Sequence, residues 1–347
     1  MKIKELIAHL ETIAPPVYQE DYDNAGLIVG NSDEDIKGVL CCLDSTEAIV
    51  DEAIEKGCNL IVAHHPIVFR GLKRITGKNY VERTVLKAIK NDIAIYAIHT
   101  NLDNVYYQGV NAKICEKLGL INTRILTPKK VLRKISANVT PENLKIIRNL
   151  LLNIGLPELN AMDQIGYNAE GSEEVIKLEA TVPIGMERKA LEILYKHDIN
   201  AEIIELSNST PNVGSGMIGE LSAPMKEVDF LKHLKEKMLV NCIRHTALRG
   251  EDVYTVAVCG GAGSFLLPQA IGQDADVFVT ADFKYHEFFD ADGKIVIADI
   301  GHFESEQFTI ELLYEIISKK FSNFALHYTE VNTNPVRYME GDRVIRG

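Results

Sequence analysis

The sequence of 347 residues predicts an α/β protein into which a second, α+β domain is inserted. Near both ends of the chain, strand-like runs alternate with helix-like runs, as in folds whose helices pack on a sheet. The middle of the chain has the order β-α-β-β-α-β instead, which is the ferredoxin-like pattern. The length also favours two domains over one.

The first strands of the outer domain are expected at 38–44 (GVLCCLD), 59–65 (NLIVAHH) and within 93–103 (IAIYAIHTNLD). Helix-like runs separate them, one from Thr46 and one over about 80–91. Each strand ends in polar residues. Open α/β sheets bind ligands beyond the carboxyl ends of their strands, so we expect a site at this edge.

The C-terminal third repeats this order. Strands are expected at 253–261 (VYTVAVCGG), within 276–286 (DVFVTADFKYH) and within 294–306 (KIVIADIGHFESE), and a periodic helix follows over roughly 306–320. Polar residues therefore follow apolar strands in this part of the chain as well.

The two sets of strands have matching separations. Leu43 and His64 are as far apart in the sequence as Cys259 and Thr280. We therefore predict two related α/β halves that place their polar strand ends around one crevice. The alternative is a chance match, because the residue identities hardly agree and periodicity alone is a weak signal.

The middle segment is predicted as an inserted domain. Its expected elements are a strand at 130–139, a helix at 141–155, strands near 163–168 and 174–183, a helix at 185–198 and a strand at 201–208. Insertion succeeds where a chain leaves and re-enters a domain at nearby exposed points. The predicted boundaries are 129–210 for the insert, and 1–128 with 211–347 for the outer domain.

Composition limits the classes of function. The net charge of −12 argues against a surface that binds nucleic acid or an anionic membrane. No apolar stretch is long enough to span a bilayer, and the N-terminus is predicted as an amphipathic helix rather than a signal peptide. None of the six cysteines forms a C-x-x-C pair, which argues against zinc-ribbon and thioredoxin-type sites. We expect a reduced, cytoplasmic protein.

The paired histidines His64 and His65 end the second predicted strand, directly before Pro66. Neighbouring side chains on a strand point to opposite faces. Proline interrupts regular strand pairing, so the strand is expected to end here and both rings could reach one site. The alternative is one packed histidine and one solvated histidine.

His302 and Glu306 are four residues apart at the start of a predicted helix, so their side chains share one face. They could bind one ion or bridge two. The alternative is a glutamate that is favoured in a first helical turn by the helix dipole. Histidine and carboxylate ligands together suit zinc, manganese, iron or cobalt.

Three further candidates are left with open roles. Asp103 follows an apolar strand and is either a ligand or a turn residue. His99, in the same HTNLD string, could be a ligand, a general acid or a residue that orients a carboxylate. His286, in DFKYHE, is the third candidate.

Several strings occur together in an order that resembles the GTP cyclohydrolase I type 2 family, also called Nif-three-like proteins. They are DNAGLIVG (23–30), LIVAHHPIVFRG (60–71), AIHTNLD (97–103), GSGMIGEL (214–221), VAVCGGAG (256–263), TADFKYHE (280–287) and GHFESE (301–306). The match covers the outer domain from end to end.

The resemblance implies a dinuclear metal centre. Its ligands would be His64, His65, Asp103, His302 and Glu306, with the glutamate bridging two divalent transition-metal ions such as zinc, iron or manganese. Long members of the family carry an insert similar to PII or CutA proteins, and members assemble as ring-shaped hexamers. We therefore expect a PII/CutA-like insert and a homo-oligomer here.

The family name implies hydrolytic attack on a nucleotide such as GTP, with His99 or His286 as general acid or base. A dinuclear-metal phosphoesterase is an alternative, because paired ions also suit phosphoryl displacement. A metal-binding regulator or scaffold without turnover is a second alternative, since a fold does not establish a chemistry. The glycine-rich strings could pass close to phosphates, or they could serve tight backbone geometry alone.

Overall fold

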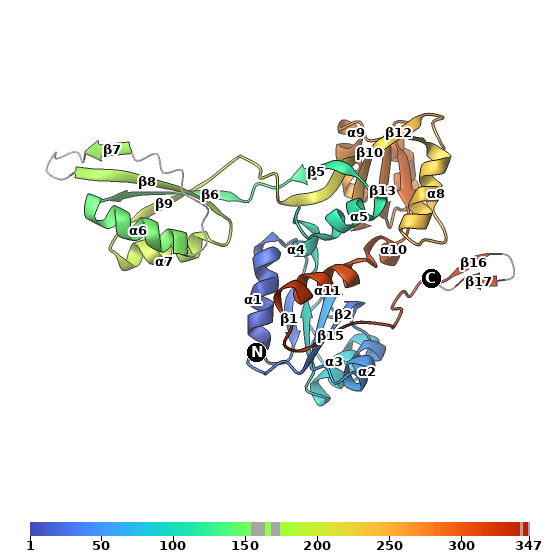
Figure 1. The fold of residues 1–347 in the computed structure, drawn as a ribbon, viewed down its shortest axis with the longest axis horizontal. Helices are drawn as coiled ribbons and strands as arrows, with labels where there is room; N and C mark the ends of the chain where they lie inside the picture. Colours follow the sequence, from blue (N-terminus) through green and yellow to red (C-terminus); the bar gives the residue numbers. More distant parts are fainter. Residues whose placement is uncertain (154–163, 168–173, 341–342, 346–347) are drawn as a thin grey trace. The chain divides into compact units, whose positions relative to one another are not determined.

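The chain forms two units, one of which is discontinuous in sequence (Figure 1). The computed structural model describes residues 1–153, 164–167, 174–340 and 343–345. Met1–Thr127 with Asn212–Gly347 form unit one, and Pro128–Pro211 form unit two.

The first sheet of unit one has the strand order β1-β4-β3-β2-β15. Three parallel strands form its centre, and β15 pairs parallel with β2, whereas β1 pairs antiparallel with β4. The strands are β1 (Gly26–Val29), β2 (Gly38–Asp44), β3 (Leu60–His65), β4 (Ala94–Ala97) and β15 (Ala325–Tyr328). The predicted strands at 38–44 and 59–65 are therefore present, and the third is short.

Helices cover both faces of this sheet. Leu40, Cys42 and Ile61 pack in one apolar cluster with α2 (Glu47–Glu55) and α3 (Tyr80–Lys90). Alternate residues of the same strands pack on the other face with α1 (Ile3–Ile13), α5 (Val110–Leu118) and α11 (Thr309–Lys320). A parallel sheet buried on both faces needs continuous apolar strands, which explains runs such as GVLCCLD.

The second sheet of unit one has the order β11-β14-β13-β12-β10-β5. Its three central strands are parallel, whereas β11 and β10 pair antiparallel with their neighbours β14 and β12. The strands are β5 (Ile121–Pro128), β10 (Gly214–Lys226), β11 (Arg244–His245), β12 (Asp252–Ala262), β13 (Val277–Ala281) and β14 (Val296–Asp299). α8 (Glu227–Lys237) and α9 (Leu267–Gly272) pack with this sheet.

The two sheets share one topological motif. The order β1-β4-β3-β2 corresponds to β11-β14-β13-β12, with three parallel strands and an antiparallel strand beside the last of them. One apolar cluster contains residues of both sheets, so the two sheets pack on a common core. Two related halves, as predicted from the sequence, would share such a strand order.

The helix predicted over roughly 306–320 corresponds to α11, and a separate short helix precedes it. α10 (His302–Glu306) ends at Glu306, and α11 begins at Thr309. The chain finishes beyond β15 with β16 (Tyr338–Glu340) and β17 (Arg343–Ile345), which pair antiparallel.

Unit two has the element order β-α-β-β-α-β and a four-stranded sheet ordered β7-β8-β6-β9, with antiparallel neighbours. Its elements are β6 (Leu132–Val139), α6 (Pro141–Asn153), β7 (Gln164–Tyr167), β8 (Glu174–Pro183), α7 (Glu187–Lys196) and β9 (Ala201–Glu205). Alternate strand residues such as Ile135 and Leu178 pack against α6 and α7. Residues 154–155 of the predicted helix, and both ends of the predicted strand 163–168, lie outside the described residues.

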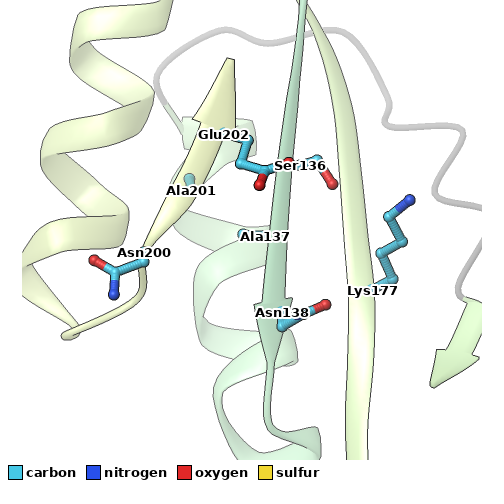
Figure 2. A pocket seen from close by; sticks show the side chains of 7 residues that line it. All are labelled: Ser136, Ala137, Asn138, Lys177, Asn200, Ala201 and Glu202. Atoms are coloured by element: carbon cyan, nitrogen blue, oxygen red, sulfur yellow. The ribbon is translucent and has the colours of Figure 1, made fainter. Parts of the chain in front are cut away.

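Unit two also has a hollow of about 300 Å³ beside β6, β8 and β9 (Figure 2). Its lining residues are Ser136, Ala137, Asn138, Lys177, Asn200, Ala201 and Glu202. Lys177 is paired with Glu179 at 2.9 Å. Within the described ranges, none of the groups of metal-ligating side chains lies here. The same ranges contain no helix that is long and apolar enough to cross a membrane.

Candidate metal centre

The polar strand ends of the two sheets meet at one cluster of histidines and carboxylates. β3 ends in His64 and His65, and Asp44 at the end of β2 stands opposite His65 in the sheet register. His99 and Asp103 follow β4, and α10 after β14 brings His302 and Glu306.

His64 is fully buried, with an exposed fraction of 0%. Its Nδ1 donates to the carbonyl oxygen of Ile98 at 2.9 Å, which leaves Nε2 with a free lone pair. Nε2 lies 3.6 Å from Asp103 Oδ1 and 3.8 Å from Glu306 Oε1. Burial lowers the pKa of His64 to about 4, so the ring is neutral at pH 7, as a metal ligand must be.

His65 reaches the same cluster from the next position of the strand. Its Nδ1 lies 2.8 Å from Asp44 Oδ1, and its Nε2 lies 3.0 Å from Glu306 Oε2. The centroids of the two neighbouring histidine rings are 4.9 Å apart, and the rings are tilted by 47°. The strand ends at this point, so the alternation of faces does not keep the rings apart.

His302 and Glu306 belong to α10, which begins after Gly301 with a φ of 94°. Nδ1 of His302 lies 2.6 Å from Asp282 Oδ2, and its Nε2 lies 3.2 Å from Glu306 Oε2. The spacing of four residues therefore places both side chains on one face of the short helix.

Gly261 in β12 allows Glu306 to lie where it does. A methyl group on Gly261 would lie 2.6 Å from Glu306 Oε1 and 3.2 Å from His302 Cε1, and the φ of Gly261 is 63°. The backbone N–H of Gly261 donates to Ser305 Oγ at 2.9 Å. In the GSGMIGEL string, a methyl group on Gly216 would likewise lie too close to the Leu266 side chain and the carbonyl oxygen of Val258. Close packing thus accounts for both glycines without a phosphate.

His99 lies beside the paired histidines. Its ring centroid is 5.3 Å from those of His64 and His65. Its Nδ1 bonds Asp23 Oδ1 at 2.7 Å, and Asp23 also accepts from the backbone and the hydroxyl of Thr100. The arrangement repeats that of His302 and Asp282, because each histidine is held at Nδ1 by an aspartate.

The other predicted acid or base, His286, is not brought into this cluster. It is exposed in the 3-10 turn Tyr285–Ala291, and its ring contacts that of Tyr285 at 5.1 Å between centroids. In the described part of the chain, no hydrogen bond, ion pair or ring contact joins His286 to the other candidates. A role for His286 in a reaction stays a prediction.

The cluster is electrostatically suited to a cation. Burial lowers the pKa of His65, but the hydrogen bonds to Asp44 and Glu306 outweigh it and raise the pKa to about 10. His302 follows the same pattern, with Asp282 and Glu306 raising its pKa to about 11. Burial and the Glu306 carboxylate raise the pKa of Asp103 well above its usual range. The negative charge of the carboxylates therefore stabilises positive charge in the cluster. In the metal-free protein, bound protons supply that positive charge.

The donor atoms also fit metal ions. Three groups hold ligand atoms within 4.8 Å of one another, namely His64-Asp103-Glu306, His65-His302-Glu306 and His64-His65-His99. Nε2 of His64 and Oδ1 of Asp103 are buried without a hydrogen-bond partner among the described residues. Tetrahedral ligands at 2.0–2.1 Å are separated by ~3.3 Å. The contacts of 3.0–3.8 Å between Glu306 and the three histidines bracket this value.

Sequence reasoning missed the aspartates that orient histidines of the cluster. Asp44, Asp23 and Asp282 each bond the Nδ1 atom of a site histidine. Burial opposes ionisation of Asp23, but the hydrogen bond from His99 lowers its pKa to about 2. The only sequence signal for these aspartates was their position. Asp44 ends the apolar strand β2, and Asp282 directly follows the apolar strand β13.

Comparison with known proteins identifies a family and solved structures that this chain resembles. A family model described as Duf34/NIF3 (NGG1p interacting factor 3) matches residues 1–335. A Staphylococcus epidermidis protein named GTP cyclohydrolase 1 type 2 homolog is 31% identical, and the alignment covers 97% of this chain and 100% of that protein. A Bacillus subtilis protein of the same name is 30% identical, with 97% and 98% covered.

A solved structure shows the same architecture. The crystal structure of a Bacillus cereus protein related to NIF3 is 31% identical, has a TM-score of 0.80, and covers 98% of this chain and 99% of its own. Fold and site together define a mixed α/β protein with a candidate metal centre where two sheets meet. The chain belongs to the Duf34/NIF3 family, which confirms the resemblance drawn from the sequence.

Proposed function

We propose that this protein is a metal-dependent hydrolase with a two-metal centre that acts on a nucleotide such as GTP. One observation carries the proposal: buried, unpartnered ligand atoms of His64 and Asp103 face a carboxylate, Glu306, that also meets His65 and His302.

Two groups of ligand atoms support a centre with two ions. His64, Asp103 and Glu306 would hold one ion, and His65, His302 and Glu306 would hold the other. Nitrogen and carboxylate ligands without a thiol suit zinc, iron or manganese. When bound, paired ions of this kind supply Lewis-acid chemistry that activates water and stabilises developing negative charge.

The chain's own residues would prepare the site for hydrolysis. The Ile98 carbonyl, Asp44 and Asp282 orient the rings of His64, His65 and His302, so that each presents Nε2 to the centre. Asp23 holds His99 at Nδ1, which leaves Nε2 of His99 to exchange a proton with water or substrate. His99 is therefore our candidate for the general acid or base.

The substrate class is supported by the names of the relatives, which are called GTP cyclohydrolase 1 type 2 homologs. A phosphoesterase is the second candidate enzyme, because the same pair of ions suits phosphoryl displacement. The non-enzymatic candidate is a regulator or scaffold that binds metal without turnover.

We propose three further properties on the family resemblance. The protein acts in the cytoplasm, it assembles as a ring-shaped homohexamer, and unit two is an inserted domain of the PII or CutA kind. The element order β-α-β-β-α-β and the strand order of unit two support the last of these.

The test begins with elemental analysis of the purified protein. We expect two equivalents of a transition metal per chain, hydrolysis of GTP by the metal-loaded protein, and loss of that hydrolysis in His65→Ala with the assembly unchanged. His245→Ala is a matched control at an exposed histidine outside the cluster. His286→Ala measures separately whether that side chain contributes to the reaction. Absence of metal after reconstitution would refute the centre, whereas a metal-loaded protein inert toward GTP and phosphoesters would favour the regulator.

A further inference from the structure

The chain continues past β15 as a segment that we call the strap, residues 329–338. The strap begins on the first sheet, where the N–H of Thr329 donates to the carbonyl oxygen of Cys41 at 2.9 Å. The N–H of Glu330 donates to the buried carboxylate of Glu52 at 2.8 Å. The sequence motifs of the metal centre include no residue of the strap.

Local hydrogen bonds hold the strap in one conformation. Asn332 Oδ1 accepts from the N–H of Asn334 at 2.8 Å, and Asn334 Oδ1 accepts from the N–H of Val336 at 2.9 Å. Asparagine side chains stabilise turns in this way, and Pro335 restricts the backbone between them. The strap therefore presents its side chains with little conformational freedom.

Thr333 contacts the carboxylate behind His65. Its hydroxyl donates to Asp44 Oδ2 at 2.7 Å, while the other oxygen of Asp44 bonds His65 Nδ1 at 2.8 Å. Asp44 is thus held at both oxygens. A carboxylate fixed in this way fixes the tautomer and the orientation of the imidazole in turn.

Asn334 contacts the helix that carries the other ligands. Its side chain is buried, with an exposed fraction of 2%, and Nδ2 donates to Glu304 Oε1 at 2.9 Å. Glu304 lies between His302 and Glu306 in α10 and is itself buried. Tyr338 also bonds Glu304, and burial together with this carboxylate raises the pKa of Tyr338 to about 12. Two neighbouring strap residues therefore contact the supports of one ligand group. Thr333 bonds the aspartate behind His65, and Asn334 bonds the helix that carries His302 and Glu306.

We propose that Thr333 and Asn334 are positioning residues for one of the two metal ions, the one held by His65, His302 and Glu306. The inference rests on the proposed metal centre. The other ligand pair is supported differently: the Ile98 carbonyl orients His64, and Asn111 donates to the backbone carbonyl of Asp103 at 3.0 Å. Loss of a strap contact is therefore expected to affect the two ions unequally.

The experiment is a stepwise cobalt(II) titration of the metal-free full-length protein, followed by absorption and by competition with a chelator. Wild type is expected to bind two equivalents. Thr333→Val, which keeps the shape but removes the hydroxyl, is expected to retain one equivalent at wild-type affinity and to bind the other about 10–100-fold more weakly. Thr333→Ser restores the hydroxyl and is expected to behave as wild type.

Asn334→Ala is the second variant, and it is expected to weaken the same equivalent. Thermal unfolding of each metal-free variant checks the fold. Thr333→Val that binds both equivalents as wild type does, or that loses affinity equally for both, overturns the role of the strap while the metal centre stands. If wild type itself binds no cobalt, or if His65→Ala binds as wild type does, the metal centre fails and the strap proposal with it.

Discussion

At the residue scale, Gly261 shows how closely the backbone of β12 approaches the candidate ligands. The φ of Gly261 is positive, which disfavours any residue with a side chain. A Cβ atom at this position would also lie closer to Glu306 and His302 than van der Waals contact allows. The sequence contains this glycine in VAVCGGAG, where it suggested phosphate contact or tight geometry. Only the neighbours of the glycine in space distinguish these roles.

Gly261→Ala is expected to displace Glu306 and to abolish high-affinity metal binding. The left-handed backbone adds a cost of about 1–3 kcal/mol to the folded state. Isothermal titration with zinc measures the first effect and thermal unfolding the second. Gly272→Ala is the matched control, because a methyl group there would meet nothing within 4 Å. Wild-type zinc affinity in Gly261→Ala would contradict the assignment of Glu306.

At the element scale, two short helices each bring one histidine and one carboxylate to the site. α4 (Thr100–Asp103) follows His99 directly, and α10 spans His302–Glu306. In both cases a histidine and a carboxylate are four residues apart, and an aspartate holds Nδ1 of the histidine. A spacing of this kind is a common accident in any one place. The same spacing follows β4 in the first sheet and β14 in the second, and this recurrence makes a chance match a poor explanation.

The strand ends also predict how the metal-free protein responds to pH. The folded-state pKa values of His65 and His302, about 10 and 11, lie above the ordinary histidine value of 6.5. Folding therefore favours protonation, and the stability from these groups is present below pH 6.5 and is lost as the pH rises through about 10. His64, with a pKa of about 4, has the opposite sign and loses stability as the pH falls from 6.5 toward 4.

We therefore expect the melting temperature of chelator-treated protein to be highest near pH 6.5 and to fall toward pH 10. Zinc should flatten the alkaline side of this profile, because a bound cation replaces the protons that the carboxylates require. Calorimetry with and without zinc measures both curves. His65→Gln should reduce the alkaline slope of the metal-free curve, and a slope unchanged by that substitution would contradict the proposed network.

At the scale of the whole molecule, unit one contains every residue of the candidate centre, although the chain leaves it at Thr127 and returns at Asn212. β5 and β10, which precede and follow this excursion, are neighbours in the second sheet. The chain thus departs from and returns to adjacent strands, as an insertion requires.

Replacing residues 128–211 with a short Gly/Ser linker is therefore expected to leave two equivalents of zinc binding intact. The metal ligands, the aspartates behind them and the strap all remain. Metal analysis and circular dichroism of the shortened protein test this. Loss of metal binding in a folded, shortened protein would show that unit two is needed for the centre. Unchanged hydrolysis of GTP would argue against control of the site by unit two.

The sequence by itself determined the α/β alternation, the apolar strands and the polar residues at their ends, because these follow from local periodicity and from burial on both faces of a sheet. It also indicated His64, His65, Asp103, His302 and Glu306, through short strings and a family resemblance. Tertiary structure alone decided that His99 joins this cluster while His286 does not. It also decided that Asp23, Asp44 and Asp282 bond the histidines of the cluster, and that the strap contacts Asp44 and Glu304. These contacts join residues far apart in the chain, so packing of the two sheets on a common core sets them and no local pattern records them.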